Sequence, residues 1–257
     1  MAVITLTSDF GNIDYYSAIL KASIVAASKQ VNIVDISHNV ESFDIVQAAF
    51  LLKNSFGYFP AATCHVGAIN LYYSSRNEMI CFQRNGHYFI GPNNGLFTLI
   101  FPDLQDREVF SIRYASLLKI EAYQAIATFA RAIEQRIPFD EIADHGVRLA
   151  KGFTVQPVIS ENSIRATIIH VDHYENVIVN VTKELFYKIS KNREFGVFYN
   201  PGSPVVNISE SYSDVPVGEV LCMFNTSGYL EIAINLGKAS SLLNLRKDET
   251  IHIDFYN

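Results

Sequence analysis

The feature of this chain that most restricts its fold is a regular alternation of strand-like and helix-like segments over the first 150 residues. Short apolar runs typical of buried strands are followed by runs with apolar residues at helical spacing. The predicted strands are 3–7, 31–37 and 62–69, with a hairpin over 78–92 that turns at Asn85-Gly86, and the predicted helices are 16–27, 44–59 and 123–136. Because parallel neighbours need a crossover helix, this order predicts an α/β domain with a mostly parallel sheet and helices on both faces.

The pattern changes near residue 153. Residues 153–164 have no clear period and contain Pro157, so we interpret them as a linker. After this segment we find only strand-like runs, separated by Gly and Pro turns. We therefore predict an α/β N-terminal domain at 1–152 and an all-β C-terminal domain, a small β-barrel or sandwich, at 165–257.

Composition excludes several classes of protein. The formal net charge of −6 argues against a nucleic-acid partner, which would need a basic face. There is no run of about 18 apolar residues, which argues against a membrane span. The start of the chain lacks the basic and apolar regions of a signal peptide. The three cysteines have no metal-binding or redox spacing, which favours reduced thiols in a cytoplasmic protein.

Four clusters of polar residues fall directly after predicted strands. They are Asp9 with Asp14, residues 35–38, residues 70–76 and residues 93–95. In open α/β sheets, ligands bind outside the carboxyl ends of the strands. For any one cluster alone, a turn or a helix cap is the favoured explanation, because turns use Asp, Asn, Ser and Gly. Four clusters at strand ends together favour one shared binding site.

Local motifs do not identify the ligand. The glycine-rich cradles G-x-G-x-x-G and G-x-x-x-x-G-K are absent, and no G-x-S-x-G nucleophile elbow occurs. His170, Asp172 and His173 lie close together in sequence, but on a strand His173 points away from the other two, so we predict no metal site. Spacing alone therefore predicts an α/β domain and a β domain with a polar site.

Six segments, in order along the chain, nevertheless match one family. They are TLTSDFGNIDYYSAILKA, IVDISHNVESFDIVQAAFLL, FPAATCHV, FIGPNNGLFT, IIHVDHYENVIVNV and FNTSGYLEIAINLGKASSLL. From residue 3 to about 245, the chain resembles the S-adenosyl-L-methionine (SAM) hydroxide adenosyltransferases, or SAM hydrolases, and their relatives the fluorinase and chlorinase. The resemblance implies an α/β N-terminal domain, a β-barrel-like C-terminal domain and no required cofactor. It also implies a homotrimer that holds SAM or adenosine between domains of neighbouring subunits.

The resemblance assigns ligand contacts in the N-terminal domain to three residues. Asp9 matches the aspartate that hydrogen-bonds both ribose hydroxyls of SAM, and an ionised carboxylate is a strong acceptor for two such donors. Asp14 matches the residue that meets the methionine amino group. Phe43 matches an aromatic residue that packs on the ligand, and the alternative for Phe43 is an ordinary core residue.

Five positions in the C-terminal domain also match. Tyr174 and Asn176 match the family's F-G-N motif, where the aromatic ring stacks on adenine and the amide reads the base edge. Glu175 replaces the usual glycine of that motif, which leaves a different local backbone open. Asn225, Ser227 and Tyr229 lie in the segment that meets the methionine end and adenine. A hairpin turn is the alternative interpretation of these three residues.

The positions that hold the attacking water in SAM hydrolases are altered here. The family has an Asp and an Arg in V-D-P-G-V-G-x-x-R-R and a His in T-F-H-G-R-D, whereas this chain has INLYYS and KIEAYQ. Asn70 stands at the Asp position, Arg76 falls one place early and Asn77 takes the Arg position. Glu121 lies opposite the His, and Tyr72 replaces a glycine that keeps the backbone close to the ligand.

Three functions therefore stay open. The chain hydrolyses SAM with an altered nucleophile site, uses another nucleophile as the halogenases do, or binds an adenosyl ligand without turnover. Asn70 cannot accept a proton at neutral pH, because its side chain is a neutral amide. We therefore expect slow conversion of SAM and water to adenosine and methionine, with binding without turnover as the alternative.

Overall fold

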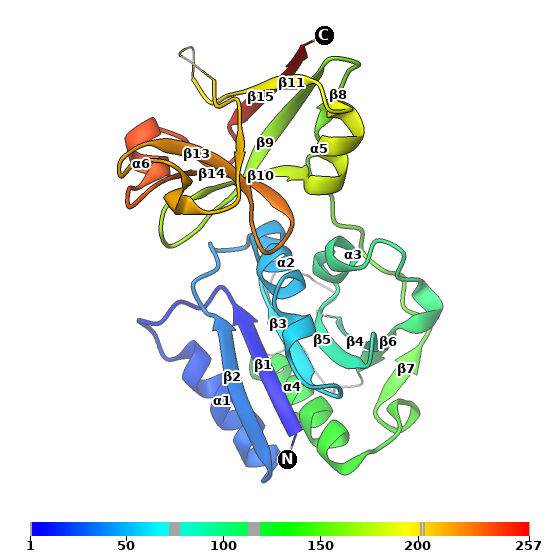
Figure 1. The fold of residues 1–257 in the computed structure, drawn as a ribbon. Helices are drawn as coiled ribbons and strands as arrows, with labels where there is room; N and C mark the ends of the chain where they lie inside the picture. Colours follow the sequence, from blue (N-terminus) through cyan, green and yellow to red (C-terminus); the bar gives the residue numbers. More distant parts are fainter. Residues whose placement is uncertain (1, 72–77, 113–118, 201, 203, 257) are drawn as a thin grey trace. The chain divides into compact units, whose positions relative to one another are not determined.

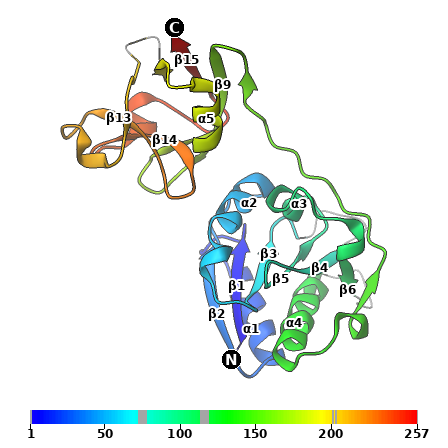
Figure 2. The ribbon, with the colours of Figure 1, turned by 45° about the vertical axis from the view of Figure 1, so that its right-hand side comes forward.

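The computed structural model describes residues 2–71, 78–112, 119–200, 202 and 204–256. The chain divides into two compact units, Met1–Thr154 and Val155–Asn257. The first unit is a sheet with helices on it, and the second is built mainly of strands, as Figure 1 and Figure 2 show. This confirms the predicted fold class.

The first unit contains a seven-stranded sheet in the order β2-β1-β3-β5-β4-β6-β7. Its strands are β1 (Ala2–Ser8), β2 (Val31–Ser37), β3 (Cys64–Ala68), β4 (Met79–Arg84), β5 (His87–Pro92), β6 (Phe110–Ile112) and β7 (Ala143–His145). Strands β2, β1, β3 and β5 are parallel, whereas β4, β6 and β7 extend the sheet in antiparallel pairs. The predicted β4-β5 hairpin is present, and Asn85 and Gly86 have φ of 51° and 79°, as a type I′ turn requires.

Helices cover both faces of this sheet. They are α1 (Tyr16–Ala27), α2 (Ile45–Lys53), α3 (Leu96–Ile100) and α4 (Lys119–Gln135), with 3₁₀ turns at Phe56–Tyr58, Asp106–Glu108 and Phe139–Glu141. Helices α1 and α4 pack over one buried cluster, and α2 and α3 over a second one. Asp44 caps α2 by accepting the N–H groups of Val46 and Gln47.

Helix α2 is shorter than the predicted helix 44–59. It ends at Lys53, and residues 56–58 form a separate 3₁₀ turn. The Ser55 hydroxyl donates to the carbonyl of Leu51 at 2.8 Å and so competes with the backbone ladder. Gly57 and Pro60 follow, and neither residue supports a continuing helix.

The second unit contains one sheet in the order β11-β15-β9-β10-β14-β13-β12, with β8 paired to β9. Its strands are β8 (Val158–Ile159), β9 (Ser163–Val171), β10 (Val177–Thr182), β11 (Glu194–Phe198), β12 (Ile208–Ser209), β13 (Val220–Phe224), β14 (Tyr229–Ile234) and β15 (Thr250–Tyr256). The sheet curls around a buried core that includes Val179, Phe186 and Ile253 (Figure 1).

Two helices and a 3₁₀ turn interrupt these strands, so the prediction of strands alone was incomplete. They are α5 (Lys183–Ser190), α6 (Ala239–Leu243) and the 3₁₀ turn Tyr212–Asp214. Helix α5 begins because the Thr182 side chain accepts the N–H of Leu185, and it buries Phe186 in the core of the unit. Strand β8 also lies within the segment that we interpreted as a linker.

The described residues include no helix that is long and apolar enough to cross a membrane. Cys64, Cys81 and Cys222 are buried and form no disulfide. Burial raises the pKa of all three thiols, so they stay protonated and act as small apolar residues.

Candidate functional site

The loops that follow β1, β2 and β3 meet at the side chain of Asp9. Its Oδ2 atom accepts the backbone N–H of Phe43 at 2.9 Å and that of Asn70 at 3.1 Å. No described residue donates a hydrogen bond to the other oxygen, Oδ1, and Asp9 is only partly buried. Asp9 therefore joins three strand-end loops through one oxygen and leaves the second oxygen for a ligand.

Both residues that donate to Asp9 have a left-handed backbone. The φ angle of Phe43 is 71° and that of Asn70 is 51°. Asn adopts this conformation at little cost, whereas a Phe is strained there. The Phe43 ring is 68% exposed, so Phe43 is not a core residue. Strained backbone of this kind concentrates at ligand sites.

Residues 35–38 hold β1 and β2 together behind Asp9. The buried Ser8 hydroxyl and His38 Nδ1 lie 2.6 Å apart. His38 Nε2 lies 3.1 Å from Asp35 Oδ1. Burial opposes the charge on Asp35, but Lys21, 2.6 Å away, and His38 outweigh it and lower the pKa of Asp35. This cluster has a supporting role.

Residues 93–95 also support the loops. Asn94 Nδ2 donates to the carbonyl of Ile69 at 2.9 Å and so fixes the residue before Asn70. Gly95 has a φ of 99°, and a Cβ atom there would lie 2.8 Å from the backbone nitrogen of Gly152. Of the four polar clusters, those at Asp9 and Asn70 therefore form the candidate site, and the other two hold it in place.

The remaining predicted residues of this unit have different locations. Asp14 is exposed in the loop before α1. Glu121 lies in the first turn of α4, with its Oε2 atom buried and without a hydrogen-bond partner among the described residues. Two residues further on, the Tyr123 ring packs edge-on against the Phe10 ring, with 6.1 Å between the ring centroids. The start of α4 therefore lies beside the Asp9 loop. Three predicted residues lie outside the described part of the chain, namely Tyr72, Arg76 and Asn77.

In the second unit, Asp172 organises the loop that carries Tyr174 and Asn176. Its carboxylate accepts the N–H of Asn176 at 2.8 Å and the Asn176 amide group at 3.1 Å. Asn176 is thereby fixed and is only 6% exposed, whereas the Tyr174 ring is 73% exposed. This arrangement presents a flat aromatic surface beside a fixed amide.

Glu175 has a left-handed backbone with a φ of 65°, a conformation that favours glycine. Its carboxylate accepts hydrogen bonds from Lys238 Nζ, at 2.8 Å, and from the backbone and hydroxyl of Ser241. The hydrogen bonds from Lys238 and Ser241 lower the pKa of Glu175. Side-chain contacts to α6 therefore offset the strain of this left-handed backbone.

Residues 225–229 form the hairpin turn between β13 and β14. Asn225 Oδ1 accepts the N–H groups of Ser227 at 3.0 Å and Tyr229 at 3.2 Å. The Asn225 N–H donates to the carbonyl of Tyr229 at 3.0 Å. These residues therefore form a hairpin turn, on which Ser227 and Tyr229 are held at fixed places.

Sequence reasoning missed Glu231. This residue lies on β14 and is 3% exposed. Burial and the nearby charge of Asp172 raise the pKa of Glu231, while hydrogen bonds from Tyr212 and Asn225 act in the opposite direction. The signal was present in YLEIAI, where a single acid interrupts an otherwise apolar strand.

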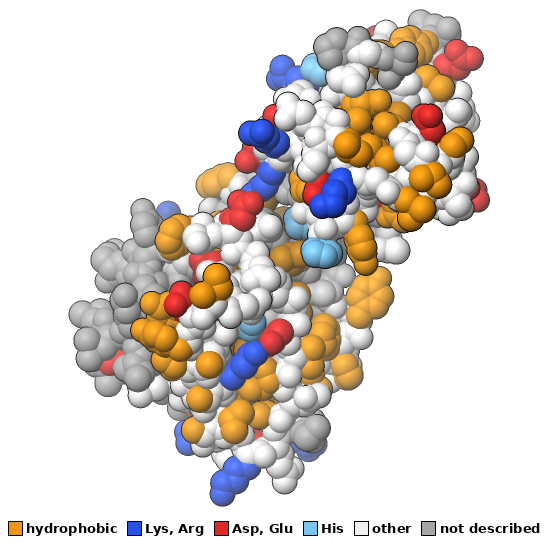
Figure 3. Space-filling view, turned by 90° about the vertical axis from the view of Figure 1, so that its left-hand side faces the viewer, with side chains coloured by type: hydrophobic (Ala, Val, Ile, Leu, Met, Phe, Trp, Pro, Cys, Tyr) orange, Lys and Arg blue, Asp and Glu red, His pale blue; other side chains and the backbone are white. Residues whose placement is uncertain are grey.

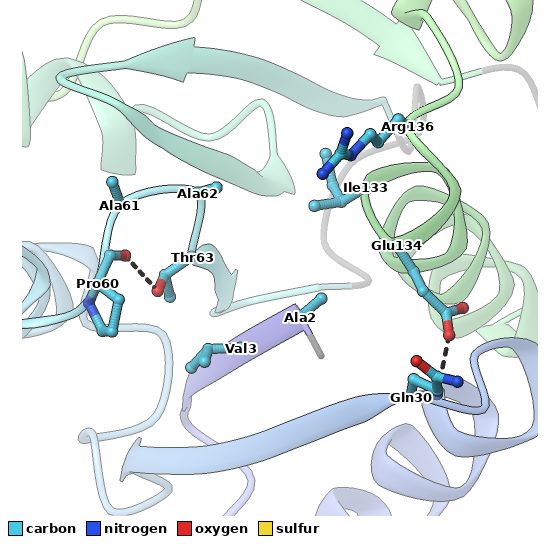
Figure 4. A pocket seen from close by; sticks show the side chains of 10 residues that line it. All are labelled: Ala2, Val3, Gln30, Pro60, Ala61, Ala62, Thr63, Ile133, Glu134 and Arg136. Carbon is cyan, nitrogen blue, oxygen red and sulfur yellow. Dashed lines mark hydrogen bonds between the residues drawn. The ribbon is translucent and has the colours of Figure 1, made fainter.

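A cavity of about 270 Å³ lies at the other end of β1 (Figure 4). The contacts between its lining residues are local ones. Glu134 accepts the N–H of Gln30 at 2.8 Å, and the Thr63 hydroxyl donates to the carbonyl of Pro60 at 2.7 Å. The cavity is at the amino end of β1, so we do not place the functional site there. The described residues also contain no group of three or more His, Cys, Asp or Glu side chains that could hold a metal ion.

Both parts of the chain match one family of known proteins. Residues 4–141 match the SAM hydroxide adenosyltransferase N-terminal domain, and residues 166–252 match the C-terminal domain. The (R)-S-adenosyl-L-methionine hydrolase of Methanocaldococcus jannaschii is 28% identical over 261 residues, with 98% of this chain and 95% of the relative covered. The hydrolase of the same name from Thermus thermophilus is 22% identical over 267 residues, with 98% of this chain and 100% of the relative covered.

Two solved structures have the same fold. An uncharacterised conserved protein from Thermotoga maritima superimposes with a TM-score of 0.83 at 25% identity, covering 99% of this chain and 100% of the other. A conserved hypothetical protein from Thermus thermophilus has a TM-score of 0.74 at 21% identity, covering 99% of both chains.

Proposed function

Because the chain belongs to the SAM hydroxide adenosyltransferase family, we propose that it binds SAM and displaces methionine from C5′ of the ribose with water. The products are adenosine and methionine. The observation that carries the proposal in the structure is Asp9, whose Oδ2 atom fixes three loops and whose Oδ1 atom is left for the ribose hydroxyls. SAM is the substrate, and no further cofactor enters the reaction.

The reaction is a displacement at carbon. Water attacks C5′ from the side opposite sulfur, the electrons of the C5′–S bond go to sulfur, and the sulfonium becomes the neutral thioether of methionine. The attacking water releases its proton to solvent or to a nearby base. Asp9 holds the ribose, Asp14 the methionine ammonium, and Tyr174 and Asn176 the adenine. Such positioning can supply about 7–11 kcal/mol of a barrier.

We expect turnover to be slow. Asn70 stands at the position of the family's aspartate and offers a neutral amide in place of a base. Loss of general-base assistance typically costs ~10²–10⁴-fold in rate. Glu121 is the carboxylate best suited to take over this role, because its Oε2 atom is unpaired among the described residues at the start of α4. Asn70 also favours the second candidate, binding of an adenosyl ligand without turnover.

Incubation of the protein with SAM tests both functions. Chromatography of the products for adenosine, methionine and, in the presence of chloride, chlorinated adenosine separates water from halide as the nucleophile. Adenosine and methionine in equal amounts support hydrolysis. Calorimetric binding of SAM with no product supports the second candidate, whereas a chain that binds neither SAM nor adenosine has neither function.

We further propose a cytoplasmic homotrimer that shares its site between subunits. Large apolar side chains lie exposed on the loops assigned to the ligand, and Figure 3 shows hydrophobic side chains gathered in patches on the surface. On these loops the exposed side chains are Ile13, Tyr15, Phe43 and Tyr174. Exposed apolar groups of this kind mark interaction surfaces. A monomer by light scattering at micromolar concentration would contradict the trimer and leave each site half complete.

A further inference from the structure

The cavity at the amino end of β1 has an arginine and a glutamate in its lining, Arg136 and Glu134 (Figure 4). Its volume of about 270 Å³ is close to the lower end of the roughly 300–1,000 Å³ of ligand pockets, which suits a small molecule. Strand β1 spans seven residues between Ala2, which lines the cavity, and Asp9, so the two places lie roughly 20 Å apart. A ligand in this cavity is therefore separate from one at Asp9.

Arg136 follows the last residue of helix α4 and has an unusual backbone. The N–H of Ile137 donates to the carbonyl of Ala132 at 2.9 Å. The N–H of Arg136 donates to the carbonyl of Ile133 at 3.3 Å, which completes the Schellman pattern of a helix end. Arg136 has a φ of 57° at the position of this pattern where glycine is usual. An arginine is strained there, so helix termination does not explain it, and strained residues concentrate at ligand sites.

The charged groups of the cavity are not neutralised by each other. Among the described residues, the guanidinium group of Arg136 has no hydrogen-bond or ion-pair partner, and Figure 4 shows it directed over the cavity. Glu134 Oε1 accepts the backbone N–H of Gln30 at 2.8 Å, and no described residue donates to Oε2. The cavity thus presents a guanidinium group and one carboxylate oxygen that the described residues leave unused.

The opposite wall of the cavity is the turn at residues 60–63. The Thr63 hydroxyl donates to the carbonyl of Pro60 at 2.7 Å, and the Thr63 N–H donates to the same carbonyl at 3.2 Å. Thr63 is 1% exposed, whereas Arg136 is exposed at the rim. Apolar side chains, including Val3 and Ile133, make up much of the lining. The cavity therefore combines a fixed, largely apolar wall with two opposite charges.

We propose that this cavity binds an α-amino acid with an apolar side chain. The guanidinium fork of Arg136 donates to the carboxylate of the ligand, Glu134 Oε2 accepts from its ammonium group, and the apolar lining receives its side chain. A simple anion would face the carboxylate of Glu134 and a simple cation would face Arg136, so a zwitterion matches the site best. The inference does not depend on the proposed function, because no residue of the cavity is assigned to the adenosyl ligand.

Calorimetric titration of the full chain with L-leucine, L-isoleucine and L-valine tests the proposal. At least one of these amino acids should bind at millimolar concentration or below. Its N-acetyl derivative lacks the ammonium group and its amide lacks the carboxylate. Each derivative should bind at least about tenfold more weakly, because a charged hydrogen bond is lost. No binding of any of the three amino acids, or equal binding of either derivative, would overturn the proposal.

Arg136→Gly removes the guanidinium group without disturbing the helix end, because glycine favours the φ of 57°. R136G should unfold at a urea concentration equal to or higher than that of wild type and bind the amino acid at least about tenfold more weakly. Lys191→Gly is the matched control, since Lys191 is a basic residue with a φ of 48° at the end of α5. Wild-type affinity in R136G, or an equal loss in K191G, would overturn the proposal.

Two further variants separate this cavity from the adenosyl site. A glutamine at 134 can still accept the N–H of Gln30, so E134Q should fold as wild type does but bind the amino acid at least about tenfold more weakly. Asp14→Ala changes the residue assigned to the methionine amino group and should leave affinity for the amino acid unchanged. Loss of binding in D14A, with wild-type affinity in E134Q, would place the amino acid at the adenosyl site and overturn the proposal.

Discussion

Asn70 donates its backbone N–H to Oδ2 of Asp9 at 3.1 Å while its own φ is 51°. The residue that we match to the family's water-holding aspartate and the residue that we assign to the ribose are therefore joined by a hydrogen bond. A substitution at Asp9 alters the acceptor of this backbone N–H, so single variants need controls that separate the two roles.

Asp9→Asn should weaken adenosine binding while the fold is retained. The asparagine oxygen can replace Oδ2 and accept from Phe43 and Asn70, but its NH₂ group replaces the free acceptor Oδ1. Loss of a hydrogen bond to a charged group costs roughly 1.5–3 kcal/mol, or about ten- to a hundredfold in affinity. Calorimetry with adenosine measures this, and wild-type affinity in D9N would remove Asp9 from the ribose site.

Asp9→Ala is the matched variant for the structural role. It should lose as much affinity for adenosine as D9N does. It should also lower the free energy of unfolding, because two N–H groups lose their acceptor. Asp14→Ala provides the ligand control. Asp14 is assigned to the methionine amino group, so D14A should weaken SAM binding but leave adenosine binding unchanged. Equal effects of D14A on both ligands would contradict that assignment.

Substitutions at Asn70 should separate the effect of the backbone conformation at residue 70 from the effect of its side chain on the reaction. Asn70→Gly should keep the stability of wild type, because glycine adopts a φ of 51° freely. Asn70→Val should lower the free energy of unfolding by about 1–2 kcal/mol, because a β-branched residue is strained there. Urea titration measures both effects, and equal stability of the two variants would show that the conformation at 70 is not constrained.

Asn70→Asp tests the missing base. If the absent carboxylate limits turnover, N70D should raise adenosine release from SAM, whereas N70G should not. If release stays at the wild-type rate, the limit lies elsewhere, and Glu121→Gln becomes the informative variant. Wild-type turnover as fast as that of a family member with the intact Asp, Arg and His would contradict the expectation of a slow enzyme.

The sequence was sufficient to predict the helices and strands whose bounds follow from a local spacing of apolar residues. The bounds of α1 and β2 agree with the predicted ranges 16–27 and 31–37, because the apolar spacing is uninterrupted there. Helix α2 was predicted too long because apolar spacing continues beyond Lys53, while the Ser55 hydroxyl and Gly57 end the helix. Helix α5 was missed, since its short run is rich in aromatic and charged residues and depends on its Thr182 cap.

The sequence predicted which residues belong to the site, but not the contacts between them. The position of Asp9 at a strand end indicated a ligand, but its contacts with Phe43 and Asn70 join residues 34 and 61 positions apart. Glu175 shows the same limit, because its side-chain bonds to Lys238 and Ser241 come from 63 and 66 positions away. Such bonds depend on the register of the whole fold, which local spacing does not contain.

Glu175→Gly should leave the loop at 172–176 in its present conformation. Glycine favours the φ of 65° that Glu175 holds, and the bonds from Asn176 to Asp172 do not involve the side chain at 175. Adenosine affinity should therefore stay within about twofold of wild type, since a twofold change corresponds to only about 0.4 kcal/mol. Asn176→Ala is the control variant, because it removes the amide that we assign to adenine. Weaker adenosine binding in E175G than in N176A would show that the contacts to α6 hold the loop.

The buried histidine pair should make stability depend on pH. His65 Nδ1 lies 2.7 Å from the Thr5 hydroxyl and Nε2 lies 3.2 Å from His87 Nδ1, in a pocket lined by Phe56 and Phe89. Burial, assisted by the nearby His87, lowers the pKa of His65 to about 3, and burial also lowers the pKa of His87. Both rings are therefore neutral in the folded protein near pH 7.

The folded pKa of His65 is below the unfolded value of 6.5, so between these values the unfolded chain binds a proton that the folded chain does not. Stability from His65 is thus fully present above pH 6.5 and is lost as pH falls toward 3, by roughly 2 kcal/mol at pH 5. Urea titrations at pH 7.5, 6 and 5 should show this decline. His65→Gln, whose neutral amide can bond to Thr5 and His87, should be less stable at pH 7.5 but decline less between pH 7.5 and 5. Parallel curves for wild type and H65Q would mean that groups other than His65 set the acid sensitivity.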